Sequence, residues 1–138
     1  MTNRKEQDLK DKARELHFNS LVVDTHADTI SRMVDPPSEK ITRLFDDPDK
    51  AREHYPIEDQ GVDLSSRLKD GHLDLPRIFE GGLGVQWWSC FVYSGYIAKK
   101  ETIDRSFVLI DALKRFEKMH PEQIGIALTA EECREMVK

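Results

Sequence analysis

The feature that most constrains the fold is a short, nearly continuous apolar run, "SLVVDTHAD", at residues 20–28. It follows a charge-rich segment, residues 3–17, whose few apolar residues recur at helical spacing. A strand this apolar is typical of a parallel sheet that is buried on both faces. Because parallel strands are usually joined by helices, the run predicts an α/β protein.

The elements expected further along the chain fit the same class. A second strand is predicted from about residue 84 to residue 93, directly after a Gly-Gly turn. The clearest helix follows, with Thr102 as its N-cap and Pro121 beyond its end. One face of this helix is apolar and contains Ile103, Phe107, Ile110, Leu113 and Phe116.

A last helix is predicted to begin after Thr129, because Thr129 and Glu132 have the spacing of a capping box. The predicted order of elements is typical of parallel α/β proteins: helix, strand, loop, strand, helix and helix.

The segment between the two strands, from about residue 29 to residue 67, is polar and irregular. A connection this long is uncommon in a compact domain unless it is a lid, a binding loop or disordered. Short helices are expected within it near residues 41–44 and 62–68. We therefore predict one domain over residues 1–138, with a long polar insertion at about residues 29–67.

Charge and composition exclude several function classes. The 138 residues include 26 acidic and 21 basic side chains, a net charge of −5, which is unsuited to binding nucleic acid. No run approaches the ~18 apolar residues of a membrane span, so no membrane partner is expected. Cys90 and Cys133 are the only cysteines and do not imply a disulfide framework, so we predict a reduced, cytoplasmic chain.

The end of the first predicted strand has the residues of a metal site. Residues two apart on an extended segment point the same way, so His26 and Asp28 can present a nitrogen and a carboxylate oxygen to one point. Both are good ligands for Zn²⁺ and similar ions. Asp24 has the same parity and could orient the His26 ring from behind, as a second-shell acceptor. A polar strand end without metal is the alternative interpretation.

A second His-x-Asp pair, His72 and Asp74, shows that the pattern alone is weak, since about half a match is expected by chance. Position separates the two pairs. In parallel α/β folds the catalytic and binding residues lie at the carboxyl ends of strands, where His26 and Asp28 are expected. His72 and Asp74 precede the next strand, and Asp74 is better explained as a helix cap ahead of Pro76.

Longer motifs resemble a known family. "VVDTHADT" followed by "GHLDLPRIFEGGLGVQWWSCFV" resembles the N-terminal part of the membrane dipeptidase (renal dipeptidase) family of zinc peptidases, and the likeness extends from about Ser20 to the end. It implies a (β/α)₈ TIM-like barrel with two zinc ions at the carboxyl ends of its strands and dipeptides as substrates. His26 and Asp28 fall on the family's first-strand metal ligands, whereas His72 and Asp74 match no ligand.

The resemblance also implies that much of the family's site is absent from these residues. Its bridging glutamate, later histidine ligands and substrate-binding residues match positions beyond residue 138, and such a barrel typically has about 250 residues. We therefore expect an incomplete barrel, a fragment inactive on its own, with unknown catalytic residues. The alternatives are a complete but non-catalytic binding or regulatory remnant, or another metal-dependent amidohydrolase barrel. A homodimer is left open.

Overall fold

The computed structural model describes residues 2–34, 61–92, 95–98 and 100–137. Its elements, in chain order, are α1 (Thr2–Phe18), β1 (Val22–Ala27), the 3₁₀-helix η1 (Thr29–Met33), α4 (Leu75–Glu80), β2 (Leu83–Trp88), α5 (Gly95–Ala98), α6 (Thr102–Met119) and α7 (Ala130–Met136).

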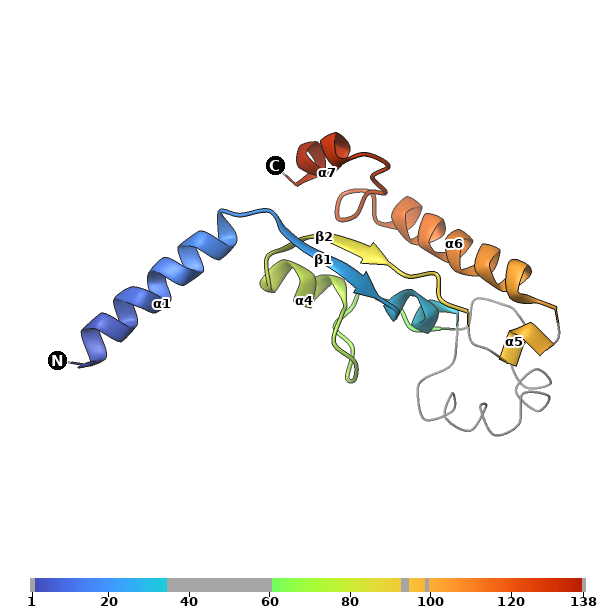
Figure 1. The fold of residues 1–138 in the computed structure, drawn as a ribbon, viewed down its shortest axis with the longest axis horizontal. Coiled ribbons are helices and arrows are strands. Elements are labelled where there is room, and N and C mark those ends of the chain that lie inside the picture. Colours follow the sequence, from blue (N-terminus) through green and yellow to red (C-terminus); the bar gives the residue numbers. More distant parts are fainter. Residues whose placement is uncertain (1, 35–60, 93–94, 99, 138) are drawn as a thin grey trace.

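The two strands β1 and β2 pair in parallel, which confirms the predicted mixed α/β class (Figure 1). α6 follows β2 and runs back along the strands in the opposite direction. β2 was expected to continue to residue 93 but ends at Trp88. Beyond Ala27 the neighbouring strand β1 turns into η1. Within the described residues, one further hydrogen bond between the strands follows, from the Ser89 N–H to the Ala27 carbonyl at 2.8 Å.

The pairing register is irregular close to the end of β1. Asp24 pairs with Gln86 and Ala27 pairs with Trp88, so three residue steps on β1 face two steps on β2. The extra residue lies in the Thr25–His26 segment. Bulges of this kind bend a strand and re-aim its side chains, and they are frequent beside functional sites.

The core lies between the strands and the helices rather than within the sheet. One buried cluster joins η1 to α6 through Ile30, Leu109 and Ala112. A second cluster joins Leu64, Leu75 and Phe116, and the Trp88 side chain packs against both. Trp88 therefore connects β2 to the helices on either side.

The expectation that β1 is buried on both faces is wrong for this structure. Val23 is 46% exposed, and residues 24–26 are exposed as well. Within the described residues β1 has one neighbouring strand, so most of its surface is left uncovered.

The prediction of Thr102 as the N-cap is wrong, because α6 includes Thr102 and its N-cap is Glu101, which makes no side-chain capping bond. The predicted apolar face is only partly buried, because Ile103 and Phe107 are 70% and 65% exposed. A different stripe faces the core and contains Arg105, Leu109, Ala112 and Phe116.

The helix predicted at residues 62–68 is absent, and a turn takes its place. The Asp63 carboxylate accepts hydrogen bonds from the Ser65 N–H at 2.9 Å and the Ser65 hydroxyl at 2.8 Å. Such local bonds offer the backbone an alternative to a helix. The helix predicted near residues 41–44, and most of the predicted insertion, lie outside the described residues.

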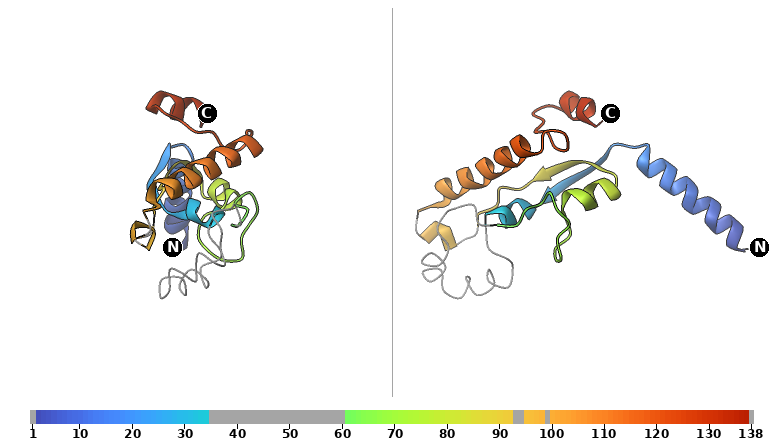
Figure 2. Two further views of the ribbon diagram at one scale, coloured as in Figure 1. Left: turned by 90° about the vertical axis from the view of Figure 1, so that its right-hand side faces the viewer. Right: turned by 180° about the vertical axis from the view of Figure 1, so that it is seen from behind.

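α1 projects away from the other elements (Figure 2). His17 Nε2 lies 2.6 Å from the Gly81 carbonyl oxygen, and the Phe18 ring lies against Gly82. Both contacts attach the end of α1 to the turn before β2. None of the helices in the described ranges is long and apolar enough to cross a membrane.

Candidate metal centre

The candidate metal ligands lie at the carboxyl end of β1, where the chain changes from strand to 3₁₀-helix. His26 is the second-last residue of β1, and Asp28 is the N-cap residue of η1. The Asp28 side chain makes no capping bond. Its main-chain carbonyl instead accepts from the Ser31 N–H at 3.0 Å and the Ser31 hydroxyl at 2.8 Å. The Asp28 carboxylate is thereby left available to face His26.

The two side chains converge as the spacing predicts. His26 Nε2 lies 3.3 Å from Asp28 Oδ1, and the side chains are 68% and 51% exposed. An imidazole nitrogen and a carboxylate oxygen that face one point and remain open to solvent fit two ligands of a zinc ion. The chemistry of this donor pair therefore suits the implied metal.

Asp24 contacts His26 through the backbone. Asp24 Oδ1 accepts a hydrogen bond from the His26 main-chain N–H at 2.9 Å. This bond spans the residue that follows Asp24 and fixes the backbone of the bulge from which the His26 ring projects. The predicted bond from Asp24 to the ring itself is not among the contacts, and that role stays a prediction.

The segment after Asp28 is held in place by contacts with residues 61, 62 and 70. The main-chain N–H groups of Gly61 and Val62 donate to the carbonyls of Met33 and Arg32 at 2.9 and 2.8 Å. The Arg32 guanidinium also pairs with Asp70 at 2.7 Å. These contacts anchor the far end of η1, whose first residue follows Asp28 directly.

The second His-x-Asp pair lies elsewhere and has a structural role. Asp74 is the N-cap of α4, as predicted, and Oδ1 accepts from the Arg77 N–H at 2.9 Å. α4 precedes β2, so this pair belongs to the amino end of the sheet. His72 is exposed, and the sequence-based separation of the two pairs by position is confirmed.

Asp74 is fully buried and joins three groups. Oδ2 accepts from the Leu68 N–H at 3.0 Å and from the Arg77 guanidinium at 2.5 Å, and that guanidinium also donates to the Leu68 carbonyl at 2.8 Å. Burial acts to raise the pKa of the Asp74 carboxyl, but the backbone hydrogen bonds and the Arg77 charge outweigh it and lower the pKa.

The described residues do not by themselves complete the candidate metal site. Among them, no group of three or more His, Cys, Asp and Glu side chains is placed to hold a metal ion. Zinc in proteins usually has three or four protein ligands. His26 and Asp28 therefore account for two ligands, and residues outside the described ranges must supply others if zinc binds here.

Sequence reasoning missed Gln86, which lies beside this site on β2. Its Nε2 donates to the Trp87 carbonyl at 3.1 Å and lies 3.5 Å from the Asp24 carbonyl. Its Oε1 is buried and has no hydrogen-bond partner within the described part of the chain. The available signal was one amide side chain within an otherwise apolar strand.

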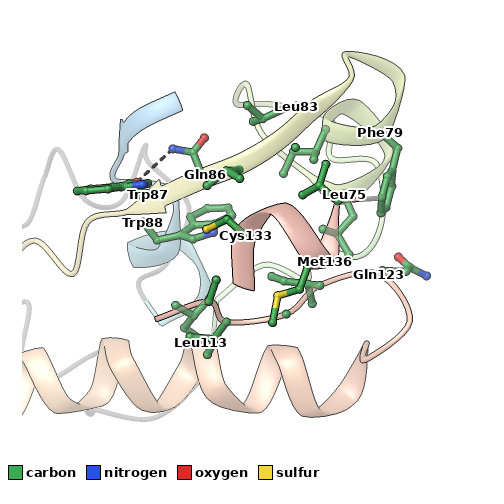
Figure 3. A pocket seen from close by; sticks show the side chains of 18 of the residues that line it. Leu75, Phe79, Leu83, Gln86, Trp87, Trp88, Leu113, Gln123, Cys133 and Met136 are labelled. Carbon is green, nitrogen blue, oxygen red and sulfur yellow. Dashed lines mark hydrogen bonds between the residues drawn. The ribbon is translucent and has the colours of Figure 1, made fainter. Parts of the chain in front are cut away.

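A pocket of about 680 Å³ is lined by β2, including Gln86, and by α4 and α7 (Figure 3). Its walls are mainly apolar and include Leu75, Phe79, Leu113 and Met136. Trp87 and Trp88 leave β2 in opposite directions, and Trp88 points toward Cys133. Neither His26 nor Asp28 lines the pocket, but Gln86 does, so the pocket adjoins the β2 side of the candidate metal centre.

A family model described as membrane dipeptidase (peptidase family M19) matches residues 10–138. The matched range covers nearly the whole chain and includes β1, β2 and α6. No solved structure matches the chain.

Proposed function

The chain belongs to the membrane dipeptidase family, peptidase family M19, and from that premise we propose that it forms part of a zinc-dependent dipeptidase. The family relationship supports the hydrolase and peptidase class. The observation that carries the metal proposal is the convergence of His26 Nε2 and Asp28 Oδ1 to 3.3 Å at the carboxyl end of a parallel strand.

His26 and Asp28 would hold one of two zinc ions, with the imidazole nitrogen and the carboxylate oxygen as ligands. Bound zinc supplies a water of lowered pKa and polarises the scissile carbonyl of a peptide. The other ligands would come from residues outside the described ranges. Asp24 would position His26 by holding its main-chain N–H, and Ser31 would position Asp28 by holding its carbonyl.

The proposal includes the architecture and setting that the family resemblance implies. β1 and β2 would be neighbouring strands of a (β/α)₈ barrel, and the substrate would be a dipeptide. The exposed surface of β1 supports this, because further strands would cover it. Two isolated, unpaired cysteines support a cytoplasmic location.

The two His-x-Asp pairs offer a matched test. The protein is expressed to its natural stop codon, and hydrolysis of Ala-Ala and of an L,D-dipeptide is measured with and without chelator. We expect chelator to abolish hydrolysis and zinc to restore it. His26→Ala should lower kcat/KM at least about 100-fold, whereas His72→Ala, an exposed histidine at the opposite end of the sheet, should leave it unchanged.

Chelator-resistant hydrolysis, or full activity in His26→Ala, would contradict the proposal. Zinc binding that depends on His26 without any dipeptide hydrolysis would instead support the second candidate, a non-catalytic binding remnant of a dipeptidase.

A further inference from the structure

Gln86 is placed where the two strands are last in register before the bulge that carries His26. It pairs with Asp24 across the sheet, and the irregularity begins at the next residue of β1. Asp24 in turn holds the His26 N–H through its carboxylate. The backbone of His26 is therefore linked to β2 through Asp24, and Gln86 is the residue of β2 at that point.

The Gln86 amide has one orientation that satisfies its neighbours. Nε2 faces two carbonyl oxygens. It lies 3.1 Å from Trp87 O (Figure 3) and 3.5 Å from Asp24 O. A rotated amide would place Oε1 against these acceptors and lose both contacts. The observed orientation leaves Oε1 buried and unpartnered within the described residues, which is an unfavourable arrangement for a buried oxygen.

An amide in this position is a poor choice for stability alone, because an apolar side chain of the same shape would remove the unpartnered oxygen. From this we propose that Gln86 is a positioning residue for the metal site. Its amide holds the Asp24 backbone against β2, so that the bulge presents His26 toward Asp28. This inference rests on the proposed function, since it requires His26 to be a metal ligand.

The test compares two substitutions of the same kind in the protein expressed to its natural stop codon. Gln86→Met keeps the length of the side chain and removes both the donor and the buried acceptor. Gln123→Met makes the same change at an exposed residue in the turn after α6 that, like Gln86, lines the apolar pocket. Zinc affinity is measured by competition with a chromophoric chelator, and thermal unfolding is followed in the absence of metal.

We expect Q86M to unfold at the wild-type temperature or above it, while its zinc affinity falls about 10-fold. At saturating zinc its kcat should return toward the wild-type value with KM little changed. Q123M should match the wild type in every measurement. If the role of Gln86 were only structural, Q86M would not lose zinc affinity while keeping its thermal stability.

Two other results have separate meanings. If zinc binding by the wild type does not depend on His26, the proposed function is overturned. If the wild type binds zinc through His26 and Q86M binds it equally well, only the role of Gln86 is overturned. Should Q86M not fold, Q86E replaces it, because a carboxylate has nearly the same shape but cannot donate to the two carbonyls. Loss of folding in both variants would overturn the positioning role in favour of a structural one.

Discussion

His26 and Asp28 converge because two structural features meet between them: a bulge near the end of β1 and the first turn of η1. The 3.3 Å between His26 Nε2 and Asp28 Oδ1 follows from this local backbone. Asp28 is an N-cap residue whose side chain does no capping. In Asp74, by contrast, the same residue type caps a helix and is fully buried. One His-x-Asp pair thus lies open to solvent at the end of a strand, whereas the Asp of the other stabilises a helix.

The contact between Asp24 and His26 predicts a difference between two substitutions of Asp24. Asp24→Asn keeps an oxygen that can accept from the His26 N–H, so zinc affinity should stay within about 2-fold of the wild type. Asp24→Ala removes the acceptor and should weaken zinc binding about 10-fold. Titration with a competing chelator measures both. Equal losses in the two variants would show that the Asp24 charge, rather than this backbone bond, supports the site.

Asp74→Ala should destabilise the protein by roughly 2–4 kcal/mol, because it removes a helix cap and leaves the Leu68 N–H and the Arg77 guanidinium without their buried acceptor. Chemical denaturation gives the free energy of unfolding. Asp63→Ala is the control, since the exposed Asp63 side chain bonds only Ser65 among the residues that the structure describes, and its loss should lower the free energy of unfolding by less than about 1 kcal/mol. Similar losses for both variants would refute this role of Asp74.

The lowered pKa of Asp74 predicts a pH dependence of stability. A carboxyl whose pKa is lower in the folded state than its ordinary 3.8 stabilises fully above that value. Its contribution is lost as the pH falls through the folded-state pKa. The difference in unfolding free energy between wild type and Asp74→Asn should therefore be constant from pH 7 to about pH 5 and shrink below about pH 4. A difference independent of pH down to the acid transition would contradict this explanation.

Gly82 combines a left-handed backbone, φ +66°, with close packing under the Phe18 ring, which a Cβ would approach to 2.9 Å. The left-handed backbone alone should lower the free energy of unfolding of Gly82→Ala by about 1–2 kcal/mol, and the substitution should also loosen the attachment of α1. Denaturation and limited proteolysis of α1 measure the two effects. Gly125→Ala is the control, because its Cβ would meet only the flexible Met136 side chain, with Sδ at 3.0 Å. Unchanged proteolysis of α1 in Gly82→Ala would show that this turn does not hold the helix.

Features fixed by nearby residues were predictable from the sequence. The apolar run of β1, the Asp74 cap and the Thr129–Glu132 capping box each depend on residues within a few positions, and the structure confirms all three. The closeness of His26 and Asp28 was also predicted from their spacing, although in the structure Asp28 has left the extended segment and begins η1.

Features fixed by distant residues were not predictable. α6 carries two apolar stripes, and its contacts with η1 decide that Leu109 rather than Phe107 is buried. The Asp63 turn, which replaces a predicted helix, is a local exception, because its bond to Ser65 is not revealed by hydrophobic periodicity. The position of Gln86 opposite Asp24 depends on the pairing register of the two strands, which the sequence does not reveal.

The central claim is that His26 and Asp28 bind one metal ion, and anomalous diffraction at the zinc edge tests it most directly. Crystals of the protein expressed to its natural stop codon are grown with zinc. We expect an anomalous peak about 2.0–2.2 Å from His26 Nε2 and from an Asp28 carboxylate oxygen, and its loss in crystals of His26→Ala. A zinc peak bound by other residues, with His26 and Asp28 making no contact to it, would contradict the claim.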